Sequence, residues 1–245
     1  LPPSVVPGTL AAITVNVSPL VEVELGKPLE IPCTYKPSIG NAVNVQWFIV
    51  STPHFISKLT RLRIIYKDMN EFLIDDGTDY SDRINKGTDF TLMLNTTMAM
   101  DERDFICQVS AGPAGVGEAT ASVKVFCNSP PAAPKVDITA STLPVLVNKQ
   151  LYKIGECLVQ NAYPEPNITW YKGSVPLLPS AAPHFDVKVT PTVTKETDGT
   201  FTVTSVLNYK PQKSDVRAKY HCEVNYKMPG SSKAIDSEKI NVTMH

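Results

Sequence analysis

The sequence predicts an all-β protein built from two tandem β-sandwich domains. One pattern of residues occurs twice: Cys33, Trp47 and Cys107 in the first half, and Cys157, Trp170 and Cys222 in the second. The tryptophans follow their first cysteines by 14 and 13 residues, and the paired cysteines lie 74 and 65 residues apart. These spacings suit a disulfide that joins two antiparallel sheets over a buried indole. The length of 245 residues also suits two domains of about 120 residues each.

Both domains are therefore expected to be immunoglobulin-like, the first of the variable type and the second constant- or variable-like. We place the first domain, with its N-terminal leader, at residues 1–128 and the second at residues 129–245. The disulfides are expected to be Cys33–Cys107 and Cys157–Cys222, because only these pairings reproduce the repeat.

The strands of the first domain follow from alternating apolar and polar residues. Residues 21–25 alternate in this way, as a half-buried strand does. Residues 29–35 and 45–49 put Cys33 and Trp47 on their apolar faces. The long cysteine spacing leaves room for extra edge strands, which is the variable-type arrangement. Further strands are expected at residues 62–66, 90–94 and 119–125.

The second domain repeats this arrangement, with strands expected at residues 136–138, 154–159, 167–171 and 201–207. Tyr220 lies two residues before Cys222, where a tyrosine corner forms a hydrogen bond through its hydroxyl. Phe105 holds the equivalent place in the first domain, which keeps the ring and loses the hydroxyl. Arg83 and Asp101 stand where variable-type domains form a structural salt bridge.

Composition and charge argue against several classes of function. Hydrophobic residues make up 42% of the chain, and no apolar run approaches the 18 or more residues that span a bilayer. The N-terminus has no basic segment before an apolar stretch, so a signal peptide is expected to be already removed or not included. A formal net charge of −1 argues against a nucleic acid partner.

The charge is unevenly distributed, with −4 over residues 1–128 and +3 over residues 129–245. Six acidic residues in the first half follow one another with no basic residue between them: Asp68, Glu71, Asp75, Asp76, Asp79 and Asp82. The simplest interpretation is a solvated loop edge. A cation site and an acidic docking surface for a basic partner are the alternatives.

Four Asn-x-Ser/Thr sequons, together with the paired cysteines, favour a secreted or cell-surface protein. Asn16 is a poor acceptor because Pro19 directly follows its sequon. The expected glycan acceptors are Asn95, Asn167 and Asn241.

Cys127 is the odd fifth cysteine. It precedes a proline-rich stretch, so we expect it to be exposed. One interpretation is a free thiol or an adventitious cysteine, and the other is a small-thiol cap or an intermolecular disulfide that links a homodimer.

We expect no enzymatic activity, no cofactor and no metal site. The four histidines lie in unrelated segments without the spacing of metal ligands. His221 alternates with Cys222 along a strand and should point away from the disulfide. The glycine-rich residues 111–117 are not followed by a helix, and there is no Gly-x-Ser-x-Gly motif.

The candidate partner-binding residues are Gln46, Phe48, Ile106 and Gln108. They alternate with Trp47 and Cys107, which point into the core, so they should face outward on the sheet that variable domains use for pairing. Two large apolar residues on one exposed face are typical of a protein-contact site. Covering of these residues by edge strands and loops is the alternative.

Several segments resemble a group of cell adhesion molecules: residues 20–24 with Gly26, 101–107, 162–172, and 220–226 with Pro229. They are similar to the first two domains of the group that contains melanoma cell adhesion molecule, Lutheran (basal cell adhesion molecule) and activated leukocyte cell adhesion molecule. The similarity covers most of residues 20–245. It implies a type I membrane glycoprotein with five extracellular immunoglobulin domains, anchored in the membrane through a segment absent from this chain.

The resemblance implies an adhesion or recognition receptor on the extracellular side of the cell membrane. Members of the group bind themselves, other surface receptors or laminin. The first domain is therefore expected to bind a second copy or another cell-surface protein. A laminin receptor, or a docking receptor for another ligand such as a virus, is the alternative.

Overall fold

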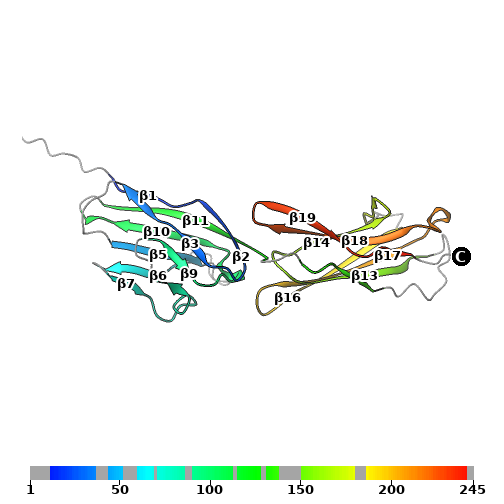
Figure 1. Cartoon of the computed structure of the whole chain (residues 1–245), viewed down its shortest axis with the longest axis horizontal. Helices are drawn as coiled ribbons and strands as arrows, with labels where there is room; N and C mark the ends of the chain where they lie inside the picture. The colour runs from blue at the N-terminus through cyan, green and yellow to red at the C-terminus, as the bar shows by residue number, and fades with distance from the viewer. Residues whose placement is uncertain are drawn as a thin grey trace, which may run out of the picture. The chain divides into compact units, whose positions relative to one another are not determined.

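The computed structural model describes residues 12–36, 44–51, 60–68, 71–85, 90–112, 115–127, 131–137, 150–179 and 186–241. The chain divides into two compact units after Val125. Apart from short 3-10 turns, the regular structure in the described residues is β-strand, which confirms the all-β prediction (Figure 1). No helix among them is long and apolar enough to cross a membrane.

The larger sheet of the first unit has six strands in the order β2-β11-β10-β5-β6-β7 (Figure 1). Their bounds are β2 Leu20–Glu24, β5 Asn44–Ser51, β6 Thr60–Asp68, β7 Glu71–Ile74, β10 Asp104–Ser110 and β11 Val116–Phe126. Strands β6 and β7 are the extra edge strands that the long cysteine spacing predicts, so this part of the prediction is confirmed.

A second sheet of the first unit has the order β3-β9-β8, and β1 pairs with β4. The bounds are β1 Thr14–Asn16, β3 Leu29–Ile31, β4 Thr34–Lys36, β8 Ile84–Asn85 and β9 Leu92–Leu94, with the 3-10 turn η1 at Ala99–Asp101. Cys33 and Cys107 form the expected disulfide. Trp47 is the register partner of Cys107 and is 1% exposed, and its indole N–H donates to the Phe90 carbonyl at 3.1 Å.

The expected salt bridge of the first unit is present. Arg83 donates to both oxygens of Asp101, at 2.6 and 2.9 Å, and the Met98 amide also donates to Asp101 at 2.7 Å. Asp101 is fully buried. The carboxylate is therefore both paired and hydrogen-bonded, as a buried charge must be.

The second unit has a four-stranded sheet of order β12-β13-β17-β16 and a five-stranded sheet in which β15-β14-β18-β19 are joined by β20 on β18. The bounds of the first sheet are β12 Lys135–Asp137, β13 Tyr152–Ala162, β16 Val187–Lys195 and β17 Phe201–Tyr209. Those of the second are β14 Asn167–Lys172, β15 Val175–Pro176, β18 Lys219–Met228, β19 Ser231–Asp236 and β20 Ile240–Asn241, with the 3-10 turn η4 at Lys213–Asp215.

The core of the second unit repeats that of the first. Cys157 and Cys222 form the expected disulfide, and Trp170 is the register partner of Cys222. The indole N–H of Trp170 donates to the hydroxyl of Ser205 on the opposite sheet at 3.1 Å. Each tryptophan thus fills the core and also satisfies its polar atom.

The tyrosine corner expected at Tyr220 is only half formed. Its ring is fully buried and its centroid lies 5.8 Å from that of Tyr209. Its hydroxyl has no hydrogen-bond partner among the described residues, so the prediction that it forms a hydrogen bond was wrong. The nearby carboxylate of Asp215 accepts instead from the Tyr209 hydroxyl, at 2.9 Å.

Candidate protein-binding face

The four candidate residues lie together on the outward face of the six-stranded sheet. Phe48 on β5 lies opposite Ile106 on β10, and Gln46 lies opposite Gln108. The intervening Trp47 is buried on the other side of the sheet, as the strand alternation requires. The structure therefore brings these residues together on one face, and a partner for that face remains a prediction.

Ile106 is only 4% exposed, so for this residue the alternative holds, in which neighbouring parts of the domain cover the face. Arg61 on β6 and Glu118 on β11 form a bidentate ion pair, with N–O distances of 2.7 and 3.0 Å. Strands β5 and β10 lie between β6 and β11, so the ion pair must pass over their outward side chains. Long charged side chains thus cover the apolar centre of the face.

The ion pair also forms a hydrogen bond with Gln108, one of the four candidate residues. Gln108 donates to Glu118 at 3.4 Å. The hydrogen bond with Glu118 raises the pKa of Arg61, and the hydrogen bond with Arg61 lowers the pKa of Glu118. The side chains of Arg61 and Glu118 are 48% and 42% exposed, so a partner can contact both directly.

A second ion pair flanks the face on its β6–β7 side. Arg63, the register partner of Phe48, donates to both oxygens of Asp75, each at 2.9 Å. Its guanidinium lies 4.0 Å from the ring centroid of Tyr66, within the range of a cation–π contact. Phe48 is therefore bordered by arginines whose orientation is fixed.

Arg61 and Glu118 are not among the residues that sequence analysis singles out. Alternation along each strand places them on the outward face, but their strands are separated by two others in the sheet. Only the strand order reveals that the two side chains meet.

The acidic run contributes Asp75 to the ion pair with Arg63. Within the described part of the chain, no group of three or more His, Cys, Asp or Glu side chains is arranged to hold a metal ion. The side chain of Asp68 lies outside the described residues. The cation-site interpretation therefore gains no support.

Cys127 is a free cysteine and is buried, so its expected exposure was wrong. Its amide donates to the Tyr163 carbonyl at 2.9 Å, and its Sγ accepts from the Tyr163 amide at 2.8 Å. Burial raises the pKa of the thiol, although the Tyr163 hydrogen bond opposes the shift. A buried neutral thiol reacts poorly, so the structure offers no support for a disulfide through this residue.

The three expected glycan acceptors are exposed. Asn95 directly follows β9, Asn167 begins β14 and Asn241 ends β20. Their accessibility is compatible with glycosylation, which remains a prediction.

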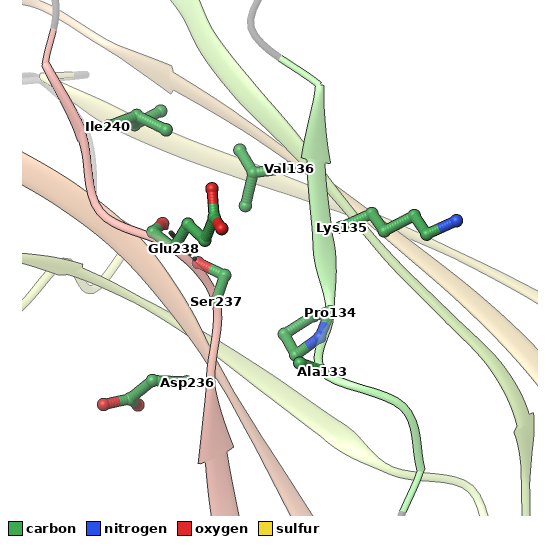
Figure 2. Close-up of a pocket in the computed structure, with 8 residues that line it drawn as sticks. All are labelled: Ala133, Pro134, Lys135, Val136, Asp236, Ser237, Glu238 and Ile240. Carbon is green, nitrogen blue, oxygen red and sulfur yellow. Dashed lines mark hydrogen bonds between the residues drawn. The ribbon is translucent and has the colours of Figure 1, made fainter.

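A groove of about 590 Å³ lies in the second unit, between β12 and the segment that joins β19 to β20 (Figure 2). Val136 and Ile240 lie between the two segments, whereas Lys135 points to the other side of β12 (Figure 2). A Cβ on Gly155 would lie 3.1 Å from Val136 and 3.3 Å from Ile240, so the glycine lets both side chains pack inward. The groove has few converging polar groups, and it fits no defined ligand chemistry.

Comparison with protein families identifies both units. Residues 16–126 match the immunoglobulin V-set domain, and residues 124–233 match the CD80-like C2-set immunoglobulin domain. The chain belongs to the immunoglobulin superfamily. The V-set match confirms the variable-type prediction, and the C2-set match defines the type of the second immunoglobulin domain, which sequence analysis left open.

This pair of immunoglobulin domains is similar to known adhesion molecules. Basal cell adhesion molecule (Lutheran) of Rattus norvegicus is 31% identical over 97% of the chain, and that of Homo sapiens is 29% identical over 98%. CD166 antigen (activated leukocyte cell adhesion molecule) of Gallus gallus is 35% identical over 70% of the chain. The chain spans only 38%, 37% and 28% of the lengths of these relatives.

Both relatives are members of the adhesion group that the sequence resembles, so that resemblance is confirmed. Neither is named as an enzyme, in agreement with the expectation that these immunoglobulin domains carry no enzymatic activity.

Proposed function

We propose that this chain is part of a cell-surface adhesion receptor and that it binds a protein through the outward face of its V-set domain. Its similarity to molecules named for cell adhesion supports the receptor role. Two disulfides and exposed sequons support a location on the extracellular side of the membrane.

The observation that carries the proposal is the arrangement around Phe48. Phe48 is partly exposed at the centre of the face, with Ile106 beside it. Two bidentate arginine–carboxylate pairs, Arg61–Glu118 and Arg63–Asp75, border it. Protein interfaces combine an apolar centre with a polar rim and are enriched in aromatic residues and arginine.

The Arg61–Glu118 pair gives the face a means of selecting its partner. A partner with complementary charges can pair with both side chains and then contact the apolar residues beneath them. A partner without these charges must break the ion pair and leave its members unpaired. Such charges contribute more to specificity and to the rate of association than to affinity.

An adhesion assay with the full chain tests this function. Beads coated with the chain are scored for aggregation with one another, for attachment to cells and for attachment to laminin. The three arms separate homophilic binding, binding to another surface receptor and binding to matrix. Phe48→Ser and Arg61→Glu are expected to abolish whichever attachment the wild type supports.

Glu30→Arg is the matched control, because Glu30 is an exposed residue of β3 on the other sheet. It reverses a charge without touching the face and should leave attachment unchanged. Substitution of Ile106 by a charged residue is unsuitable, because a carboxylate at this buried position would destabilise the domain. Attachment at wild-type strength by both face variants would contradict the proposal.

A further inference from the structure

The second unit carries a depression of about 480 Å³, and half of the residues that line it are basic. Its cationic side chains come from three separate segments: Lys172 at the end of β14, Arg217 in the turn before β18 with Lys219 at the first residue of β18, and Lys239 just before β20. Asp215 is the only acidic residue of the lining.

The charge of Asp215 is already matched within the protein. Its carboxylate accepts from the Lys172 ammonium at 2.9 Å, the Tyr209 hydroxyl at 2.9 Å and the Gln212 amide at 2.8 Å. Burial raises the pKa of Asp215, but these hydrogen bonds outweigh burial and lower it. Asp215 thus pairs with Lys172. Its negative charge does not neutralise the other three cations of the lining, Arg217, Lys219 and Lys239.

The remaining three cations have no anionic partner among the described side chains. Arg217, Lys219 and Lys239 are exposed, and none takes part in an ion pair there. Of the acidic residues beyond position 128, only Asp137 has its side chain outside the described part. Three uncompensated charges in one depression create a positive potential that attracts anions.

We propose that this depression binds a sulfated glycosaminoglycan chain. Clustered cations from three segments fit a ligand that carries several anionic groups, and arginine can hold a sulfate with two parallel hydrogen bonds. The other lining residues, Gly173, Ser214 and Ala218, are small. The residues that line the depression thus offer a protein partner no large apolar anchor, whereas a polar glycan needs none.

Lys213 extends the basic surface along the chain. It is exposed on η4, immediately before the lining residue Ser214. The site is distinct from the V-set face and adds to the proposed function without depending on it. It would let the second domain hold the polyanionic glycans of a cell surface or matrix.

Heparin binding by the full chain tests the site. We compare wild type with the triple variant Arg217→Ser, Lys219→Ser and Lys239→Ser, by salt elution from a heparin column and by titration with heparin oligosaccharides. The wild type is expected to be retained. The triple variant should elute at lower salt and bind about tenfold or more weakly, because each lost contact removes a charge from the complex.

The matched control substitutes three other exposed lysines of the same domain, Lys188→Ser, Lys195→Ser and Lys233→Ser. It changes the net charge equally and should lose much less affinity. Lys239→Ser alone, which leaves β18 untouched, should lose part of the affinity and keeps the test valid if the triple variant folds poorly.

Further ligands determine the chemical class. Desulfated heparin and a polyglutamate peptide are each expected to bind at least tenfold more weakly than heparin. Equal binding of polyglutamate would replace the glycan with an acidic protein segment and overturn the proposal. The proposal would also be overturned if the triple and control variants lost heparin affinity equally, or if the heparin column did not retain the wild type.

Discussion

Tyr209 and Tyr220 pack against each other in the second domain, but their hydroxyls differ in hydrogen bonding. The Tyr209 hydroxyl donates to Asp215 at 2.9 Å and accepts from Lys172 at 3.0 Å. The Tyr220 hydroxyl is buried and has no partner among the described residues. A buried hydroxyl contributes to stability only where its hydrogen bonds are made.

Removal of the two hydroxyls should therefore have different effects. Tyr209→Phe is expected to lower the free energy of unfolding by about 1–3 kcal/mol, because it leaves Asp215 and Lys172 underpaired. Tyr220→Phe should leave stability unchanged or raise it slightly. Urea unfolding of both variants provides the comparison, and a larger loss in Tyr220→Phe than in Tyr209→Phe would contradict this description.

Asp215 should make the second domain sensitive to acid. Its folded-state pKa lies below the ordinary value of 3.8, so its stabilising effect is complete above that value and is lost as pH falls through the lower folded-state pKa. We expect the wild type to lose stability below about pH 4 more steeply than Asp215→Asn. Melting temperatures from about pH 6 to about pH 2 measure this difference, and parallel curves would contradict it.

At the scale of elements, Gly117 determines how closely the segment that includes Ile13 and β1 approaches β11. A Cβ at this position would lie 2.6 Å from the Ile13 carbonyl oxygen and 3.1 Å from the Val15 side chain. Gly117→Ala should displace the segment and lower the free energy of unfolding by about 1–3 kcal/mol. Thr120→Ala, at an exposed site on the same strand, is the control. If denaturant unfolding shows that Gly117→Ala is as stable as Thr120→Ala, this close approach would be excluded.

The exposed sequons lead to a prediction about glycosylation. When the chain is secreted from a eukaryotic host, Asn95, Asn167 and Asn241 should carry glycans and Asn16 should not. Intact mass before and after treatment with an N-glycosidase, followed by peptide mapping, measures occupancy. If the N-glycosidase leaves the mass unchanged and peptide mapping finds no glycan at any of the three sites, the result would argue against a surface glycoprotein.

Most elements of the fold were predictable because their signals are local or repeated. The cysteine and tryptophan pattern predicts both disulfides, and alternation places Trp47 inside and Phe48 outside. The Arg83–Asp101 bridge was predictable because the fold type fixes both positions.

The features that were missed depend on partners far away in the sequence. Ile106 is buried on a strand that lies between the two members of the Arg61–Glu118 ion pair, and no periodicity reveals a pair that spans two intervening strands. Cys127 is buried and forms two hydrogen bonds with the backbone of Tyr163, although it precedes a proline-rich stretch. Among the described residues the Tyr220 hydroxyl has no partner, and Asp215 accepts from Tyr209 instead.

At the scale of the whole molecule, the two domains present surfaces of different chemistry. The first half of the chain carries a net charge of −4 and the second half +3. The V-set face combines partly covered apolar residues with paired charges, whereas the basic depression carries three cations with no anionic partner among the side chains that the structure describes. Binding at the depression should weaken steeply with salt, and binding at the face should be less affected.

A glycan placed on the V-set face tests the central claim most directly, since it blocks any partner regardless of its chemistry. Gln46→Asn with Phe48→Thr creates a sequon at position 46, and Glu30→Asn with Pro32→Thr creates one on β3 of the other sheet. We predict that, with both sites occupied as judged by mass, attachment of beads to their partner is abolished by the first glycan and kept with the second. Attachment at wild-type strength with the glycan at position 46 would contradict recognition through this face.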